Sequence, residues 1–196
     1  MSSSSGRWLN RGMLQPVVVL AGRLSHQRDI SLKSGRTVAQ ALRRVGHEVV
    51  EADVDSALIE TLRANDSAVV FPMLHGGLGE NGALLEVLQL MGIPYVGSGP
   101  ATCRISFDKS IASRAVAAAG VATPQQVALP HDIFRELGAR TVIRSITESF
   151  GLPVIVKPAR GGSSLGVTKI DDIDDFPQAI ANAYACLLYT SDAADD

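Results

Sequence analysis

A lysine followed by a run of small residues stands near the end of the chain, in a pattern suited to phosphate. Lys157 follows the β-branched stretch Val154–Val156, which favours a strand. The loop over residues 161–166 then supplies glycines and hydroxyls, namely Gly161, Gly162, Ser163, Ser164 and Gly166. Glycines let backbone N–H groups approach a ligand closely, hydroxyls add donors, and the lysine adds a positive charge.

Other interpretations of this stretch stay open at the level of the residues. A second strand over residues 167–170 makes an ordinary hairpin with a flexible tip equally consistent. The P-loop pattern is absent, because that motif needs Gly-Lys-Ser/Thr opening a helix. Lys109, at the start of an Ala-rich helix, is typical of a solvated surface lysine, but with Lys157 it can hold two faces of a polyphosphate. Arg160 either reaches a nucleotide or lies on the surface.

A glycine-rich group in the first half of the chain follows a predicted strand. His75 precedes Gly76, Gly77 and Gly79, and Glu80 comes directly after them. A lone histidine is more often structural, but backbone donors and an imidazole at a strand end can meet an anionic group. We interpret the cluster as functional, with Glu80 either orienting the imidazole or meeting a cation. An earlier loop, residues 22–31, lacks Gly-x-Gly-x-x-Gly, which disfavours a dinucleotide site and a Rossmann oxidoreductase.

Alternating elements must position these loops. The pattern predicts strands over residues 17–21, 48–54, 68–71 and 93–96. Between them it predicts a helix that ends at about residue 45 and helices over residues 57–64 and 83–91. The continuous apolar run at 17–21 predicts a central parallel strand buried on both faces. Val38, Leu42 and Val45 are spaced for one buried helix face, Gly46 suits the position after that helix, and Ser56 is a candidate cap of the next.

The second half predicts a smaller α+β unit. We expect a helix over residues 108–119, a short strand over 127–129, a helix ending near Phe150, and antiparallel strands flanking the Gly/Ser loop. The first half, with its alternating strands and helices, predicts a parallel α/β domain.

Composition limits the classes of function. The 196 residues are 46% hydrophobic and 19% charged, as expected of a globular protein with a core. A net charge of −2 gives no footprint for nucleic acid, and no apolar run reaches membrane-spanning length. Cys103 and Cys186 are far apart and lack histidines at metal spacing, so we expect reduced thiols, no metal ligands and a cytoplasmic protein.

Four segments together resemble the D-alanine–D-alanine ligases of the ATP-grasp superfamily. They are residues 20–31 (LAGRLSHQRDIS), 75–82 (HGGLGENG), 94–99 (PYVGSG) leading to Phe107, Asp108 and Lys109, and 156–166 (VKPARGGSSLG). Each segment alone is weak, whereas their order and spacing are specific. The resemblance implies a Rossmann-like parallel-sheet N-terminal domain followed by a truncated α+β ATP-grasp domain.

The resemblance also implies an activity and roles for residues. ATP phosphorylates the carboxylate of one D-alanine, and the amine of a second attacks the acyl phosphate, which makes the dipeptide for peptidoglycan. Lys109 and Lys157 match nucleotide-binding lysines, and the loop with Gly161, Gly162, Ser163 and Ser164 matches the mobile loop that covers the phosphates. Closure of that loop would exclude water. Ser163 matches a catalytic serine that links the loop to the substrate site. Gln27, His75 and Glu80 match residues of the first D-alanine subsite, and Gln27 is expected to be catalytic as well as substrate-binding.

Three residues depart from the family pattern: Arg23 replaces a small residue, Asn81 replaces aspartate, and Gln27 replaces glutamate. Gln27 matters most, because a neutral amide accepts a hydrogen bond from the substrate ammonium without neutralising it. A weaker first site, a different substrate or a sequence error would each explain it. We expect the Mg²⁺ ligands and adenine contacts in a C-terminal part beyond this chain, and no ligase turnover by the chain alone.

The expected organisation is a disordered leader (residues 1–13, with Met13 an alternative start), an N-terminal substrate-binding domain (14–105), a partial ATP-grasp domain (106–186) and a non-native tail (187–196). The parent protein is expected to be a cytoplasmic homodimer that uses ATP, Mg²⁺ and D-alanine and binds neither nucleic acid nor membrane. The alternatives are another ATP-grasp carboxylate–amine ligase, such as a D-alanine–D-lactate or D-alanine–D-serine ligase, or a non-catalytic nucleotide-binding module.

Overall fold

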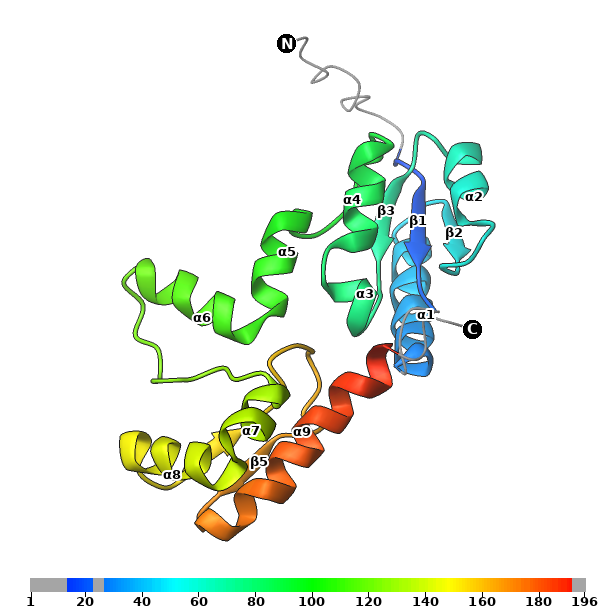
Figure 1. The fold of residues 1–196 in the computed structure, drawn as a ribbon. Helices are drawn as coiled ribbons and strands as arrows, with labels where there is room; N and C mark the ends of the chain where they lie inside the picture. Colours follow the sequence, from blue (N-terminus) through cyan, green and yellow to red (C-terminus); the bar gives the residue numbers. More distant parts are fainter. Residues whose placement is uncertain (1–13, 23–26, 192–196) are drawn as a thin grey trace. The chain divides into compact units, whose positions relative to one another are not determined.

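The computed structural model describes residues 14–22 and 27–191, and side chains as far as Cys186 (Figure 1). The predicted leader, Arg23 and residues 192–196 of the predicted tail lie outside this range. The chain splits into two compact units, one of Met1–His75 with Leu84–Ser98, the other of Gly76–Ala83 with Gly99–Asp196. The domain limits expected at residues 105 and 186 stay a prediction.

The first unit is built on a three-stranded parallel sheet. Its strands are β1 (Val17–Leu20), β2 (Val49–Ala52) and β3 (Val69–Pro72), in the order β2-β1-β3. Figure 1 shows β1 between its two neighbours, and all four of its residues are buried. The predicted central strand is therefore confirmed, because a strand covered on both faces must be apolar throughout.

Three helices accompany this sheet: α1 (Arg28–Arg44), α2 (Leu58–Ala64) and α4 (Ala83–Leu90). Ala39 of α1 packs with Val17 and Val19, and Val38 and Leu42 border this cluster as predicted. Val45 was wrongly predicted to be buried and is 67% exposed. Since α1 ends at Arg44, Val45 leaves the helical periodicity that carried the prediction.

Two smaller predictions in this unit were wrong. The cap of α2 is not Ser56: the carboxylate of Asp55 accepts the N–H of Ala57 at 2.9 Å, and Ala57 is the N-cap residue without a side-chain bond. The predicted strand at residues 93–96 is reduced to one parallel bridge between Val70 and Tyr95. Pro94 lacks a backbone N–H and cannot donate to a ladder, which limits the pairing.

The second unit contains a two-stranded antiparallel sheet, β4 (Val154–Val156) and β5 (Thr168–Ile170), as predicted. Its helices are α3 (Gly77–Glu80), α5 (Pro100–Phe107), α6 (Lys109–Ala118), α7 (His131–Leu137), α8 (Ala139–Phe150), the 3-10 turn η1 (Ile173–Asp175) and α9 (Phe176–Ser191). A buried cluster of Ile143, Ile170, Phe176 and Ala179 joins α8, β5 and α9.

Two features of the second unit differ from expectation. Residues 127–129 form no strand. The only sheet in the described part of this unit is the β4–β5 pair, and these residues do not pair with either strand. Helix α5 was not predicted, although Pro100 at its first position is a known start signal. Helix α9 includes residues 187–191 of the expected tail, and the non-native origin of that tail stays a prediction.

None of the helices within the described ranges combines the length and the apolar character needed to cross a bilayer.

Candidate functional site

Asp108 sets the start of α6 and so the position of Lys109. Its Oδ1 accepts the N–H of Ser110 at 3.1 Å, the N–H of Ile111 at 3.3 Å and the hydroxyl of Ser110 at 2.8 Å. A side-chain acceptor at this position satisfies amides that have no partner inside the helix. Lys109 is therefore held as the first residue of α6.

The segment that leads into the Gly/Ser loop is attached to this helix start. The N–H of Lys109 donates to the carbonyl of Ala159 at 2.9 Å, and Asp108 and Arg160 form an antiparallel bridge. The Lys109 ammonium donates to the carbonyl of Gly161 at 2.6 Å. Two parts of the chain that are 52 residues apart in sequence thus meet through backbone and side chain.

Burial and one neighbouring charge weaken the hold of Lys109 on its proton. Burial lowers the pKa of Lys109 below its usual value, and the nearby charge of Lys157 lowers this pKa further. The negative charges of Asp108 and Glu80 act in the opposite direction without cancelling the effect. Lys109, which is partly buried and repelled by Lys157, would gain from an anion placed between the two lysines.

Glu80 lies beside the same loop. A methyl group added to Gly162 would stand 3.0 Å from the Glu80 carboxylate, so glycine allows this close approach. Of the two roles expected for Glu80, the cation contact matches its attraction to Lys109.

The two loop serines contact their own loop in this structure. The hydroxyl of Ser163 accepts the N–H of Leu165 at 3.2 Å, and the carbonyl of Ser164 accepts the N–H of Val167 at the same distance. These contacts give the loop a turn conformation of its own. The roles of Ser163 and Ser164 toward a ligand stay predictions.

The remaining predicted site residues belong to the first unit. Gln27 is the N-cap residue of α1, and its carbonyl accepts the N–H of Ser31 at 3.0 Å. The Nε2 atom of His75 lies 3.1 Å from the hydroxyl of Ser34 on α1. His75 therefore follows β3 and is held against α1, at the carboxyl end of the parallel sheet, where open α/β sheets bind ligands.

Sequence reasoning missed one residue that organises this sheet end. Ser31 is 1% exposed, accepts the N–H of Gly22 at 2.9 Å and donates to the carbonyl of Met73 at 2.7 Å. It joins the segments after β1 and β3 to α1. The available signal was a hydroxyl four positions before Gly35 and eight before Ala39, on the buried side of α1.

The structure thus assembles part of the predicted site within one unit. Lys109, Lys157, Gly161, Gly162 and Glu80 meet in the second unit, whereas Gln27 and His75 lie in the first. Within residues 14–22 and 27–191, no three His, Cys, Asp or Glu side chains are grouped so that they could hold a metal ion.

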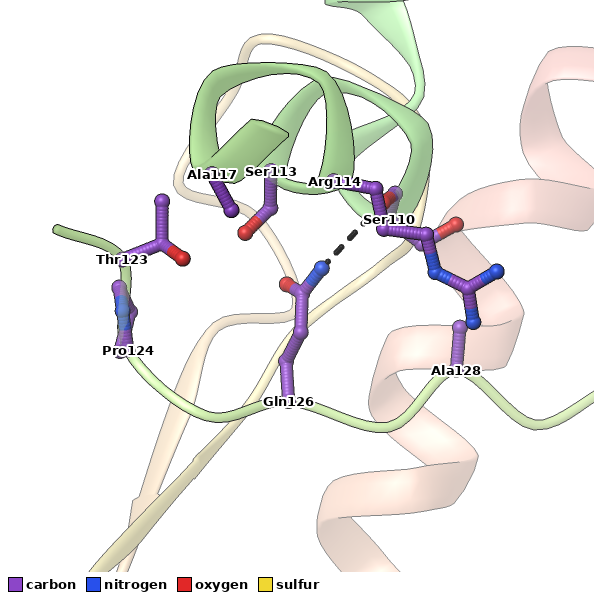
Figure 2. Close-up of a pocket in the computed structure, with 8 residues that line it drawn as sticks. All are labelled: Ser110, Ser113, Arg114, Ala117, Thr123, Pro124, Gln126 and Ala128. Carbon is purple, nitrogen blue, oxygen red and sulfur yellow. Dashed lines mark hydrogen bonds between the residues drawn. The ribbon is translucent and has the colours of Figure 1, made fainter. Parts of the chain in front are cut away.

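Two cavities accompany these elements. One, of about 150 Å³, lies between α6 and residues 123–128, and Figure 2 shows Gln126 reaching across it to the carbonyl of Ser110. The other, of about 250 Å³, lies along α1 and β2 and includes Asp53, which pairs with Arg28 at 2.6 Å. Neither lining contains a residue that was predicted to bind nucleotide or D-alanine.

Comparison with protein families gives two matches. Residues 55–98 match the model described as D-ala D-ala ligase N-terminus, and residues 115–187 match the model described as D-ala D-ala ligase C-terminus.

Curated relatives carry the same name. The D-alanine–D-alanine ligase of Desulforudis audaxviator is 38% identical over 175 residues, 88% of this chain and 55% of that protein. The D-alanine–D-alanine ligase of Polaromonas sp. is 39% identical over 167 residues, 85% of this chain and 48% of that protein. The chain spans about half the length of the curated relatives it matches.

Solved structures have the same fold. D-alanyl-alanine synthetase A from Vibrio cholerae superposes with a TM-score of 0.71 at 26% identity, over 87% of this chain and 56% of that one. The D-alanine–D-alanine ligase from Bacillus anthracis gives 0.67 at 26%, over 88% and 55%. The VanG D-Ala:D-Ser ligase from Enterococcus faecalis gives 0.70 at 22%, over 88% and 60%, which shows the shared fold alone.

Proposed function

Because the chain belongs to the D-alanine–D-alanine ligase family, we propose that it forms part of an ATP-dependent ligase that joins two D-alanines for peptidoglycan synthesis. In this reaction the carboxylate of one D-alanine takes the γ-phosphoryl group of ATP, and the amine of the second displaces phosphate from the acyl phosphate. The chain supplies residues that bind the phosphates of ATP, together with part of the first D-alanine subsite.

The observation that carries the proposal is the meeting of Lys109 with the Gly/Ser loop. Its ammonium lies 2.6 Å from the Gly161 carbonyl, and the charge of Lys157 acts on it from nearby. Two ammonium groups beside a glycine-rich backbone fit the charge and the donors that a triphosphate needs. A triphosphate would exchange the Gly161 carbonyl for phosphate oxygens as the partner of Lys109.

The other roles follow the family pattern. Gln27 and His75 would hold the first D-alanine with Glu80, and Ser163 would connect the loop to that substrate. Mg²⁺ would screen the triphosphate and activate the γ-phosphoryl group. We also propose that the whole protein is a cytoplasmic homodimer that needs no nucleic acid or membrane.

A second candidate is a ligase for D-alanine with D-serine or D-lactate. The same fold occurs in the VanG D-Ala:D-Ser ligase, so the fold does not decide between second substrates. Gln27 in place of glutamate is the feature that best supports the third candidate, a nucleotide-binding module without ligase activity.

Titration calorimetry of the chain tests the proposal. ATP should bind, and Lys109→Gln and Lys157→Gln should each weaken ATP binding by about tenfold, as expected when one charge-assisted contact is lost. The exposed Lys169→Gln, in the same unit, is the matched control and should leave ATP binding unchanged. Equal ATP binding by all four proteins would contradict the proposal.

D-alanine and L-alanine, each titrated into the full-length protein, separate a ligase from the nucleotide-binding module. Preferential binding of D-alanine supports a ligase. ATP binding without any D-alanine binding would favour the nucleotide-binding module.

A further inference from the structure

Arg160 and Asp108 connect the loop over residues 159–166 to α6 through both side chain and backbone. The Arg160 Nε lies 3.2 Å from the Asp108 Oδ2, and the same two residues form the isolated antiparallel bridge. The other carboxylate oxygen of Asp108 is occupied by the first amides of α6. One carboxylate therefore fixes the start of α6 with one oxygen and the start of the loop with the other.

We propose that Arg160 is a positioning residue whose ion pair with Asp108 holds residues 159–166 against the start of α6, so that Lys109 and Lys157 face the same phosphate chain. The inference rests on the proposed function only in taking polyphosphate as the ligand. Arg160 then acts through the loop and does not itself contact the phosphates.

Repulsion between cations is the physical reason that the ion pair of Arg160 with Asp108 is needed. Lys109, Lys157 and Arg160 bring three positive charges to this region, and Lys109 is partly buried. The repulsion between the two lysines lowers the pKa of Lys109 and, without an anion present, favours separation of the loop from the helix. Asp108 is a fixed counter-charge that opposes this separation.

The shape of the contact also favours a structural task for Arg160. Its side chain is 67% exposed, while that of Asp108 is 13% exposed, so the pair has one anchored and one accessible partner. The backbone bridge already aligns the two residues, and the side-chain contact closes over it. The Arg160 Nε is thereby engaged by the Asp108 carboxylate.

Holding the loop in place affects affinity through the population of the competent state. A ligand that binds only the docked loop has its apparent affinity reduced by the fraction of time that the loop is undocked. An ion pair with one exposed partner changes such an equilibrium by a factor of about two to five. The loss of triphosphate affinity is therefore expected to be modest and to equal the change in the equilibrium between the docked and the undocked loop.

The experiment uses the whole chain and four variants of Arg160 and Asp108, and it has two readouts. Arg160→Gln removes the cation, Asp108→Asn keeps a cap acceptor but removes the charge, the double variant combines them, and Arg160→Lys restores a cation. Arg144→Gln is the matched control, since Arg144 pairs with Glu148 at 2.9 Å on α8 of the same unit. Hydrogen exchange reports opening of residues 157–167, and NMR shifts of the Gly161 and Gly162 amides report binding of inorganic triphosphate.

We expect Arg160→Gln and Asp108→Asn each to speed loop exchange about twofold to fivefold and to weaken triphosphate binding by the same factor. The double variant should be no worse than either single variant, Arg160→Lys should recover part of the loss, and Arg144→Gln should change neither readout.

Several results would overturn the inference. Exchange and affinity unchanged in Arg160→Gln would do so, as would single effects that multiply in the double variant. Weaker triphosphate binding without faster loop exchange would instead make Arg160 a direct phosphate contact. If the unmodified chain failed to bind triphosphate, the proposed function would be contradicted. The exchange measurements would still decide whether the ion pair of Arg160 with Asp108 holds the loop against α6.

Discussion

The two sheets of this chain are stabilised in different ways. In the first unit every residue of β1 is buried, and α1 adds Ala39 to the same core. In the second unit the middle residue of β4, Ile155, is 55% exposed, and none of the residues of α6, all of them described, is buried. The first sheet is covered on both sides, whereas the second has one apolar side chain turned to solvent.

The difference shows which forces hold the proposed site. Burial fixes the end of β3, which His75 follows, and α1, whose N-cap residue is Gln27, because both elements belong to a packed parallel sheet with its covering helix. The loop over residues 159–166 is held instead by the Asp108 carboxylate, the carbonyls of Ala159 and Gly161, and the close approach of Gly166 to α9. Truncations in the first unit should therefore reduce stability most, and changes in the second should depend on backbone geometry and charge.

Leu20→Ala should have the largest effect. Leu20 is fully buried in β1, and loss of a buried leucine side chain costs about 4 kcal/mol through lost burial and the cavity left behind. Hydrogen exchange of the β1 and β3 amides measures the free energy of unfolding of the first unit. Leu90→Ala, at an 84% exposed position on α4, is the control and should change it by less than about 0.5 kcal/mol. Equal effects would break the comparison.

Gly166→Ala should destabilise the second unit by about 3 kcal/mol, through backbone strain and overpacking together. At Gly166 φ is +71°, and an added methyl would stand 2.8 Å from Cys186 Sγ and 3.1 Å from Ala183 Cα. Gly151 has the same φ of +71° and open space around it. Gly151→Ala should therefore cost only the strain, about 1 kcal/mol. Urea unfolding followed by exchange of the β4 and β5 amides separates the two, and identical losses would exclude the α9 contact as a constraint.

Ser31→Ala should cost about 2 kcal/mol, because it leaves the Gly22 N–H and the Met73 carbonyl without their buried partner. The loss tests whether a polar contact also holds the first unit, beyond burial. Ser56→Ala is the matched control, since Ser56 is exposed and does not cap α2. Thermal unfolding of both variants measures the difference, and a neutral Ser31→Ala would restrict the stabilisation of this unit to apolar packing.

The pH dependence should be the smallest effect and should come from the second unit. Because the folded pKa of Lys109 lies below that of the unfolded chain, the unfolded chain binds more protons in the interval between the two values. The stability of this unit should therefore rise with pH across that interval. Lys157→Gln should raise the pKa of Lys109 by removing its repulsion, whereas Lys169→Gln should not. NMR titration of the Lys109 side chain measures the pKa, and a pKa unaffected by Lys157→Gln would show that burial alone is responsible.

Much of this fold follows from local patterns in the sequence. The apolar run of β1 and the glycine after α1 predicted their elements, because burial on both faces and a positive φ, +97° at Gly46, restrict the residue types. Residues 127–129 have strand-forming character but no strand beside them, so the prediction failed for lack of a partner. The prediction that Ser56 caps α2 failed for a related reason. Asp55 and Ser56 both have suitable side chains, and only the backbone path decides that Asp55 accepts the N–H of Ala57.

By itself, the sequence determined the alternation of strands and helices, the parallel character of the first unit, and the loop of glycines and serines after Lys157. These features depend on residue type and short-range spacing. Only the tertiary structure decided that Asp108 joins α6 to Arg160, that Ser31 connects the segments after β1 and β3, and that Lys109 meets Gly161. Each of these contacts pairs groups that are far apart along the chain, and no local spacing encodes which distant donor will meet which acceptor.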